Sequence, residues 1–113
     1  VLLDDFLQHS DRCSQASSEN FLRARFAHAE TIIPFAALLK IPFLSDQSTP
    51  IEETFTYEKN VWRGEIVSPM AANIQWDIFR PTNDGEERPT LVRMLYNEYP
   101  VSFKSTCQPY DTT

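Results

Sequence analysis

The feature that most constrains the fold is the alternation of apolar and polar residues in the last third of the chain. The alternation is clearest over residues 72–79, and two further strand-like runs follow at 91–96 and 99–103. In the first run the apolar residues occupy every second position (Ile74, Trp76, Ile78). This period of two is typical of strands with one buried face. Turn-forming residues separate the runs at 81–89 and at Asn97-Glu98. The pattern predicts a hairpin meander at the C-terminal end.

The preceding residues predict helices and one further strand. Residues 1–9 carry an amphipathic stripe that predicts the end of a helix, and the Ser-rich residues 10–20 predict a linker. Residues 21–27 alternate as a short strand does, and residues 31–40 show helical spacing. Residues 42–60 predict a loop rich in Ser, Thr, Asp, Glu and Pro. The order helix, strand, helix and then three strands predicts an α/β or α+β class.

Composition excludes several classes of function. The chain has 113 residues, which suits one small domain, and a net charge of −6, which argues against nucleic acid as a partner. A small anion remains possible because a few local arginines can reverse the sign inside a pocket. Only two glycines are present, so Gly-rich phosphate loops are excluded. No apolar run approaches the ~20 residues of a membrane-spanning helix.

The cysteine and histidine counts argue against a metal site. Cys13 and Cys107 lack the C-x-x-C spacing of zinc and redox sites, and His9 and His28 are the two histidines. The cysteines may equally form a disulfide, stay as free thiols or pair outside this chain. Because the sequence begins at Val1 without Met or a signal peptide, we expect a processed or excised piece.

The sequence His28-Ala-Glu30 lies where the predicted strand ends and the next helix begins. In extended backbone, residues i and i+2 point the same way, so both side chains can face one pocket. The unpaired N–H groups of a helix start attract a phosphate or carboxylate. A charged His would bind that anion, and a protonated Glu would donate a proton to a leaving oxygen. The alternative is a capping His and a first-turn Glu that complements the helix dipole.

Longer blocks around this triplet resemble the histidine acid phosphatase family. Residues 23–39, RARFAHAETIIPFAALL, are similar to the branch of multiple inositol polyphosphate phosphatases and related phytases, which carry H-A-E after a strand. Further similar blocks follow in the same order, namely WRG at 62–64, SPMAANIQWD at 68–77, LVRMLYNE at 91–98 and FKSTC at 103–107. The resemblance covers nearly the whole chain.

The resemblance implies a role for each matched residue. His28 would contact the phosphoryl group, and Glu30 would protonate the leaving alcohol and later activate water. The family forms a phosphohistidine, which divides hydrolysis into two displacements, while arginines neutralise the phosphoryl oxygens. Glu30 must begin protonated, which implies a preference for acidic pH. The implied substrate is an inositol polyphosphate, without a metal or organic cofactor. The implied fold is part of the family's mixed-sheet α/β sandwich, and the implied location is extracellular.

One departure from the family limits what this chain does alone. The nucleophile of the family lies in an N-terminal R-H-G-x-R-x-P motif, and no such motif occurs here. His9 lies between Gln8 and Ser10 and does not replace it. We therefore expect residues 1–113 to be the C-terminal part of a histidine acid phosphatase domain, inactive without its N-terminal half. The alternatives are a non-catalytic or degenerate piece that binds phosphorylated ligands or another chain, and a scaffold that binds nothing specific.

Three arginines are weaker candidates for binding the anion. Arg63 precedes the next predicted strand and would reach an anionic substrate from the rim of the pocket, or else stack on Trp62 at the surface. Arg23 and Arg25 share one face of the predicted strand 21–27, which lies either beneath the pocket or at a solvated edge.

Overall fold

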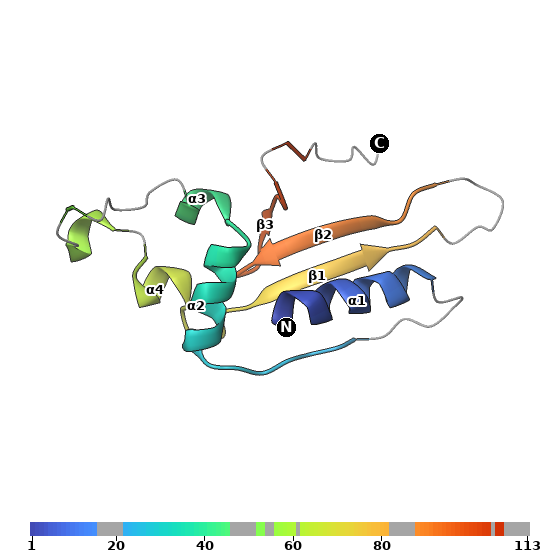
Figure 1. Cartoon of the computed structure of the whole chain (residues 1–113), viewed down its shortest axis with the longest axis horizontal. Coiled ribbons are helices and arrows are strands. Elements are labelled where there is room, and N and C mark those ends of the chain that lie inside the picture. The colour runs from blue at the N-terminus through green and yellow to red at the C-terminus, as the bar shows by residue number, and fades with distance from the viewer. Residues whose placement is uncertain are drawn as a thin grey trace.

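The fold is a small antiparallel sheet with helices packed around it (Figure 1). The computed structural model describes residues 1–15, 22–45, 52–53, 56–60, 62–81, 88–104 and 106–107. In this part of the chain the helices are α1 (Leu2–Gln15), α2 (Ala29–Leu38), α3 (Pro42–Ser45), the 3-10 helix η1 (Tyr57–Lys59) and α4 (Gly64–Val67), and the strands are β1 (Ile74–Phe79), β2 (Leu91–Tyr96) and β3 (Tyr99–Val101). The mixed α/β class is therefore as expected from the sequence.

The three strands form the predicted meander, in the order β1-β2-β3 with both pairs antiparallel. Trp76 lies opposite Met94, and Met94 lies opposite Val101, so these three side chains share one face of the sheet. The β2–β3 turn is the predicted Asn97-Glu98, and both residues have positive φ, 48° and 69°. Positive φ at both central residues gives the type I′ geometry, whose twist suits a two-residue hairpin.

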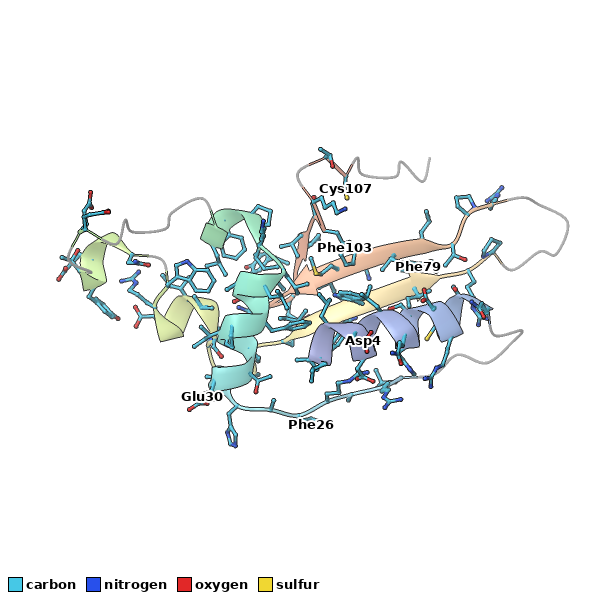
Figure 2. The ribbon with its side chains drawn as sticks, viewed as in Figure 1. Asp4, Phe26, Glu30, Phe79, Phe103 and Cys107 are labelled. Atoms are coloured by element: carbon cyan, nitrogen blue, oxygen red, sulfur yellow. The ribbon has the colours of Figure 1, made fainter. Side chains whose placement is uncertain are left out.

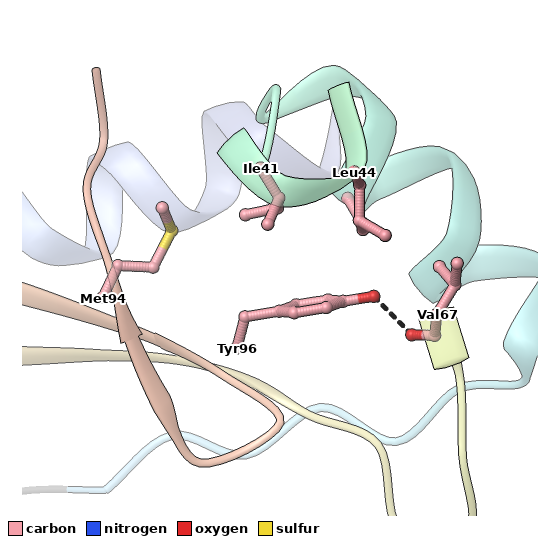
Figure 3. Close-up of a cluster of buried hydrophobic side chains, with 6 residues drawn as sticks. Ile41, Leu44, Val67, Met94 and Tyr96 are labelled. Atoms are coloured by element: carbon pink, nitrogen blue, oxygen red, sulfur yellow. Dashed lines mark hydrogen bonds between the residues drawn. The ribbon is translucent and has the colours of Figure 1, made fainter. Parts of the chain in front are cut away.

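The core lies where α2, α3 and α4 meet the sheet. Its buried side chains come from all of these elements and from the residue that links α2 to α3 (Ala36, Ile41, Leu44, Val67, Met94, Tyr96). Figure 3 shows the ring of Tyr96 among them, with its hydroxyl donating a hydrogen bond to the backbone carbonyl of Val67. Burial raises the pKa of Tyr96 to about 12 because the phenolate loses its hydration there.

Helix α2 is anchored in this core by its C-terminal end. Leu39 caps the helix, and Lys40 has a φ of 51°. The N–H of Lys40 bonds to the carbonyl of Ala37 (3.1 Å), and the N–H of Ile41 bonds to that of Ala36 (3.3 Å). This is a Schellman motif, with Lys at the position that usually holds Gly. The accompanying apolar contact is made by Ala36 and Ile41, which are both buried.

The first helix is longer than the sequence predicts. The expected linker at residues 10–20 is wrong over its first part, because α1 continues to Gln15, while residues 16–20 lie outside the described part. The serines that suggested a linker bond back within the helix. The hydroxyl of Ser10 donates to the carbonyl of Phe6 (2.9 Å), and that of Ser14 donates to the carbonyl of Asp11 (2.7 Å). Such back-bonding lets serine sit inside a helix.

The strand predicted at residues 21–27 does not form. Residues 22–28 run alongside α1 toward the start of α2 (Figure 1), without pairing to any strand in the described part of the chain. Alternation gave the wrong result because a strand needs a neighbouring strand, and residues 22–28 find none here. Leu22 and Phe26, the expected apolar face, are 91% and 97% exposed.

The predicted loop at 42–60 also contains regular structure. Its first residues form α3, and η1 lies near its end, while residues 46–51, 54 and 55 lie outside the description. Helix α4 was not predicted, because four residues are too few to show a helical period. Most of the predicted turn at 81–89 also lies outside the described residues. Among the residues that are described, no helix is both long and apolar enough to traverse a lipid bilayer.

Candidate phosphate site at the start of helix α2

His28 and Glu30 both lie at the start of α2, but the extended backbone expected through Glu30 ends at His28, because Ala29 and Glu30 already belong to the helix. The expectation that residues i and i+2 point the same way in extended backbone therefore does not apply to this pair. His28 is the N-cap residue with extended backbone (φ −90°, ψ 171°), and its side chain makes no capping hydrogen bond. Its carbonyl accepts hydrogen bonds from the N–H groups of Thr31 (2.9 Å) and Ile32 (3.4 Å). The alternative role of His28 as a side-chain cap is therefore not realised in this structure.

Glu30 lies in the first turn of the ten-residue helix α2. Figure 2 shows it at the end of α2 that points away from the sheet. Pro34 lies within the helix and has no N–H to donate to the carbonyl four residues earlier, which is that of Glu30. Both His28 and Glu30 are exposed, and neither side chain makes a hydrogen bond or ion pair with the residues that the structure describes. Both groups are therefore accessible to a ligand.

This arrangement can bind an anion and transfer a proton. The first N–H groups of a helix lack intrahelical partners and carry partial positive charge, so they stabilise a phosphate oxygen. His28 and Glu30 stand at the same helix end, one able to donate a hydrogen bond to an oxyanion and the other able to deliver a proton. Glu30 as a simple partner of the helix dipole also fits this geometry.

Arg63 is not joined to His28 or Glu30 by any contact of the described residues. It precedes α4, its Nη1 lies 3.5 Å from Oε1 of Glu65, and its guanidinium carbon lies 4.9 Å from the ring centre of Tyr57. Tyr57 donates a hydrogen bond to Glu65, and this bond, with a smaller contribution from burial, raises the pKa of Tyr57. The stacking partner of Arg63 is therefore Tyr57. The indole N–H of Trp62 instead donates to the carbonyl of Leu44 (3.0 Å).

Arg23 and Arg25 both reach toward Asp5 of α1. The Nε of Arg25 donates a hydrogen bond to Oδ2 of Asp5, and Nη2 of Arg23 lies 4.0 Å from Oδ1 of the same carboxylate. His9 lies on the same helix, and burial lowers its pKa, helped by Arg23 and Arg25 and by Arg12. Through their contacts with Asp5, Arg23 and Arg25 therefore hold residues 22–28 against α1.

Sequence reasoning missed the acidic partners of these arginines. Asp5 precedes Arg25 by 20 residues, and no local spacing links the two. Tyr57 approaches Arg63 because residues 56–60 fold back toward α4, which the sequence pattern does not indicate. Glu65 was within reach of prediction, because it follows Arg63 by two residues at the start of a helix.

Neither a metal centre nor a disulfide is present in the described part of the chain. Within it, no group of three or more His, Cys, Asp or Glu side chains is placed to hold a metal ion. Cys13 is half-buried, Cys107 is exposed, and both are free thiols. Of the alternatives that the sequence left open, the structure therefore rules out a disulfide between Cys13 and Cys107.

Comparison with known proteins identifies relatives of one kind, although no family model matches the chain. The multiple inositol polyphosphate phosphatase 1 of Dictyostelium discoideum is 36% identical over 77 residues, which is 68% of this chain and 12% of that protein. The multiple inositol polyphosphate phosphatase of Bifidobacterium longum in complex with inositol hexasulfate has 49% identity over 99% of this chain, with a TM-score of 0.73. Its apo form (46%, TM-score 0.74) and phosphate complex (44%, TM-score 0.73) match equally well.

These matches cover a small part of each relative. The chain spans 22–23% of the length of the Bifidobacterium longum enzyme. Sequence identity and shape nevertheless agree over almost the whole of this chain. The resemblance found in the sequence is thus confirmed by independent comparison. The chain is a homologue of the multiple inositol polyphosphate phosphatases, which are histidine acid phosphatases, and it corresponds to one part of them.

Proposed function

We propose that this chain supplies the proton donor of a phosphatase that hydrolyses inositol polyphosphates. The observation that carries the proposal is the position of H-A-E at the exposed start of α2, in a chain 44–49% identical to a multiple inositol polyphosphate phosphatase over 99% of its length. A histidine acid phosphatase solved with phosphate and with inositol hexasulfate supports an anionic inositol ligand as the substrate class.

Glu30 and His28 have separate roles in the proposed reaction. The N–H groups of α2 and the imidazole of His28 bind the phosphoryl oxygens and neutralise their charge. When the bond between phosphorus and the ester oxygen breaks, the carboxyl group of Glu30 gives its proton to the leaving alcohol. Glu30 is then a carboxylate that takes a proton from the water which attacks the phosphoenzyme. The nucleophilic histidine is contributed by residues outside this chain, since the sequence has no R-H-G-x-R-x-P motif.

Arg63 is proposed as a substrate-binding residue at the rim. It is the N-cap residue of α4, which packs against α2, and its guanidinium is already paired with the carboxylate of Glu65. A polyphosphate has to compete with that carboxylate for Arg63. We therefore expect Arg63 to contribute modestly to affinity and not to the chemical step.

The direct test is a chimera, in which this chain replaces the aligned part of the Bifidobacterium longum enzyme. The 49% identity over 99% of the chain makes the junctions well defined. We expect the chimera to release phosphate from inositol hexakisphosphate. Glu30→Gln should lower kcat by at least about a hundredfold, as expected for loss of a general acid, with little change in ligand affinity. The matched control is Glu58→Gln, an exposed glutamate in η1.

Two results would contradict the proposal. Unchanged turnover in the Glu30→Gln chimera would remove Glu30 from the role of acid. A chimera that folds and binds inositol hexakisphosphate without hydrolysing it would favour the second candidate function, a non-catalytic phosphate-binding piece. The observation favouring that candidate is the absence of the nucleophile motif. Calorimetry of the 113-residue chain with inositol hexakisphosphate measures that binding directly.

Export from the cell is a further part of the proposal and rests on the resemblance to exported phosphatases. Expression of the native gene with a C-terminal tag, followed by detection in medium and cell fractions, tests it. Retention of all the protein inside the cell would contradict export.

A further inference from the structure

Two neighbouring residues of α1 contact the chain on both sides of the His28–Glu30 pair. Asp5 accepts a hydrogen bond from Nε of Arg25, which precedes His28 by three residues. The guanidinium carbon of that arginine also lies 4.5 Å from the ring centre of Phe6. The ring of Phe6 in turn lies 5.3 Å from that of Phe35, which follows Glu30 by five residues in α2. One turn of α1 thus contacts both the segment that enters the site and the helix that leaves it.

The position of residues 22–28, which lead into the site, depends on the contact of Arg25 with Asp5 and Phe6. Residues 22–28 make no sheet pairing with the described residues, and the two large apolar side chains, Leu22 and Phe26, point into solvent (Figure 2 labels Phe26). By contrast, the side chain of Arg25 is only 23% exposed, and it combines an ion pair with a position over an aromatic ring. Partial burial strengthens such a charge-assisted bond over an exposed one. Arg25, with Arg23 at the longer distance of 4.0 Å from the same carboxylate, therefore fixes residues 22–28 in place.

The departing helix is held independently. Phe35 is buried, and Phe6 also packs edge-on against Trp76 of β1, with ring centres 5.2 Å apart. Phe6 is therefore immobilised between the sheet and α2. The direction of the backbone at His28 is set by two fixed points, the Arg25–Asp5 bond before it and the Phe35–Phe6 contact after it.

We propose that Asp5 and Phe6 are positioning residues for His28 and Glu30. They touch neither the ligand nor the reacting atoms, and they set the angle between residues 22–28 and α2, which decides whether both side chains face the same phosphate. The inference rests on the proposed function of His28 and Glu30 as the phosphate site. Without the Asp5 bond, the segment samples other directions, and affinity falls with the fraction of molecules that keep the competent arrangement.

The test uses the full chain with Asp5→Asn and, as matched control, Asp4→Asn. Asp4 carries the same charge on the same turn of α1 and is bonded to Gln8 within the helix. The first measurement is the backbone ¹⁵N order parameter of residues 25–28. We expect values near those of rigid backbone, ~0.85, in the wild type and in Asp4→Asn, and values below ~0.6 in Asp5→Asn.

The second measurement is the affinity for inositol hexakisphosphate, read from the imidazole proton signal of His28. Only two histidines are present, so a His9→Gln spectrum assigns it. We expect affinity about tenfold weaker in Asp5→Asn, the size expected from loss of one charge-assisted hydrogen bond, and within about twofold in Asp4→Asn. Simple electrostatics predicts the opposite direction, because removing a carboxylate and freeing Arg25 should strengthen binding of a polyanion.

Further variants separate positioning from general loss of structure. The charge-reversed pair Asp5→Arg with Arg25→Asp should recover order at residues 25–28 and most of the affinity. Phe6→Leu, which keeps an apolar side chain but removes the ring contacts with Arg25, Phe35 and Trp76, should weaken binding a few-fold. If Asp5→Asn disorders the segment without weakening binding, or behaves as Asp4→Asn does, the positioning role is overturned. If the wild-type signal of His28 does not respond to inositol hexakisphosphate at all, the proposed phosphate site fails, while the order parameters still decide whether Asp5 holds the segment.

Discussion

Replacing Tyr96 by Phe tests whether the core is organised as described. Tyr96 is 1% exposed, and its hydroxyl donates to the carbonyl of Val67 in α4. Tyr96→Phe keeps the ring and leaves that carbonyl without this donor inside a low-dielectric core. The loss of one buried hydrogen bond, with an acceptor left unpaired, costs about 1–3 kcal/mol. We therefore expect the free energy of unfolding near pH 7 to fall by about 2 kcal/mol.

The same hydroxyl makes this difference depend on pH. The pKa of Tyr96 is raised to about 12 by burial, whereas an unfolded tyrosine titrates near ~10. A group whose folded pKa is raised contributes stability that is complete below the unfolded pKa and lost as pH rises through the folded one. The free energy of unfolding of the wild type should therefore fall, relative to that of Tyr96→Phe, by about 1 kcal/mol at pH 11 and by about 2 kcal/mol at pH 12.

The assay is urea unfolding followed by tryptophan fluorescence, because Trp62 and Trp76 both pack against the core. Wild type, Tyr96→Phe and the control Tyr99→Phe are compared between pH 7 and pH 12. Tyr99 is exposed, so its variant should follow the wild type throughout. Two results would refute the account of the buried hydroxyl. One is an equal free energy of unfolding for the wild type and Tyr96→Phe at pH 7, and the other is a difference between them that stays constant up to pH 12.

Two further predictions concern the surface. Lys40→Gly should raise the free energy of unfolding by about 1 kcal/mol, measured by thermal or urea unfolding. Lys40 has a φ of 51°, a conformation that is unfavourable for a residue with a Cβ atom. An unchanged free energy of unfolding would contradict this prediction. Hydrogen bonds from Gln75 and then Arg93 lower the pKa of Asp77. A group whose pKa is lowered by folding contributes stability that is present above its unfolded pKa and is lost as pH falls through its folded pKa. Asp77→Asn should therefore reduce the loss of stability below pH ~4. The same dependence of unfolding free energy on acid pH in the wild type and in Asp77→Asn would contradict this prediction.

The sequence predicts those elements whose determinants are local. Strand β2 has the predicted bounds 91–96, because the short apolar run and the Asn97-Glu98 turn that ends it are both read from neighbouring residues. Helix α2 was predicted two residues too late, since the N-cap is His28, which local preference does not favour. The H-A-E triplet therefore lies at the junction of an extended segment and a helix, as predicted, although Ala29 and Glu30 already belong to the helix.

Prediction from the sequence fails where contacts between distant residues determine the structure. Residues 22–28 have the alternation of a strand, yet they lie against α1 through Arg25 and Asp5, which are 20 residues apart in the chain. Arg63 stacks on Tyr57 and not on its neighbour Trp62, because Trp62 turns toward the carbonyl of Leu44. In both cases the arginine contacts a residue that is not its neighbour in the sequence and lies nearby only in the folded chain.

The burial along α2 explains how one helix can have one end fixed in the core and the other end exposed. Its C-terminal part contributes the buried Phe35 and Ala36 and ends in the Schellman motif, whereas His28 and Glu30 at its start are exposed. Because backbone hydrogen bonds transmit the orientation of the buried turns to the exposed ones, the core fixes α2 while leaving its first N–H groups free for an anion. The core cannot fix residues 22–28 in the same way, because they lie before the helix. A phosphate site at this junction therefore needs a second support, and the Asp5–Arg25 bond on α1 provides one.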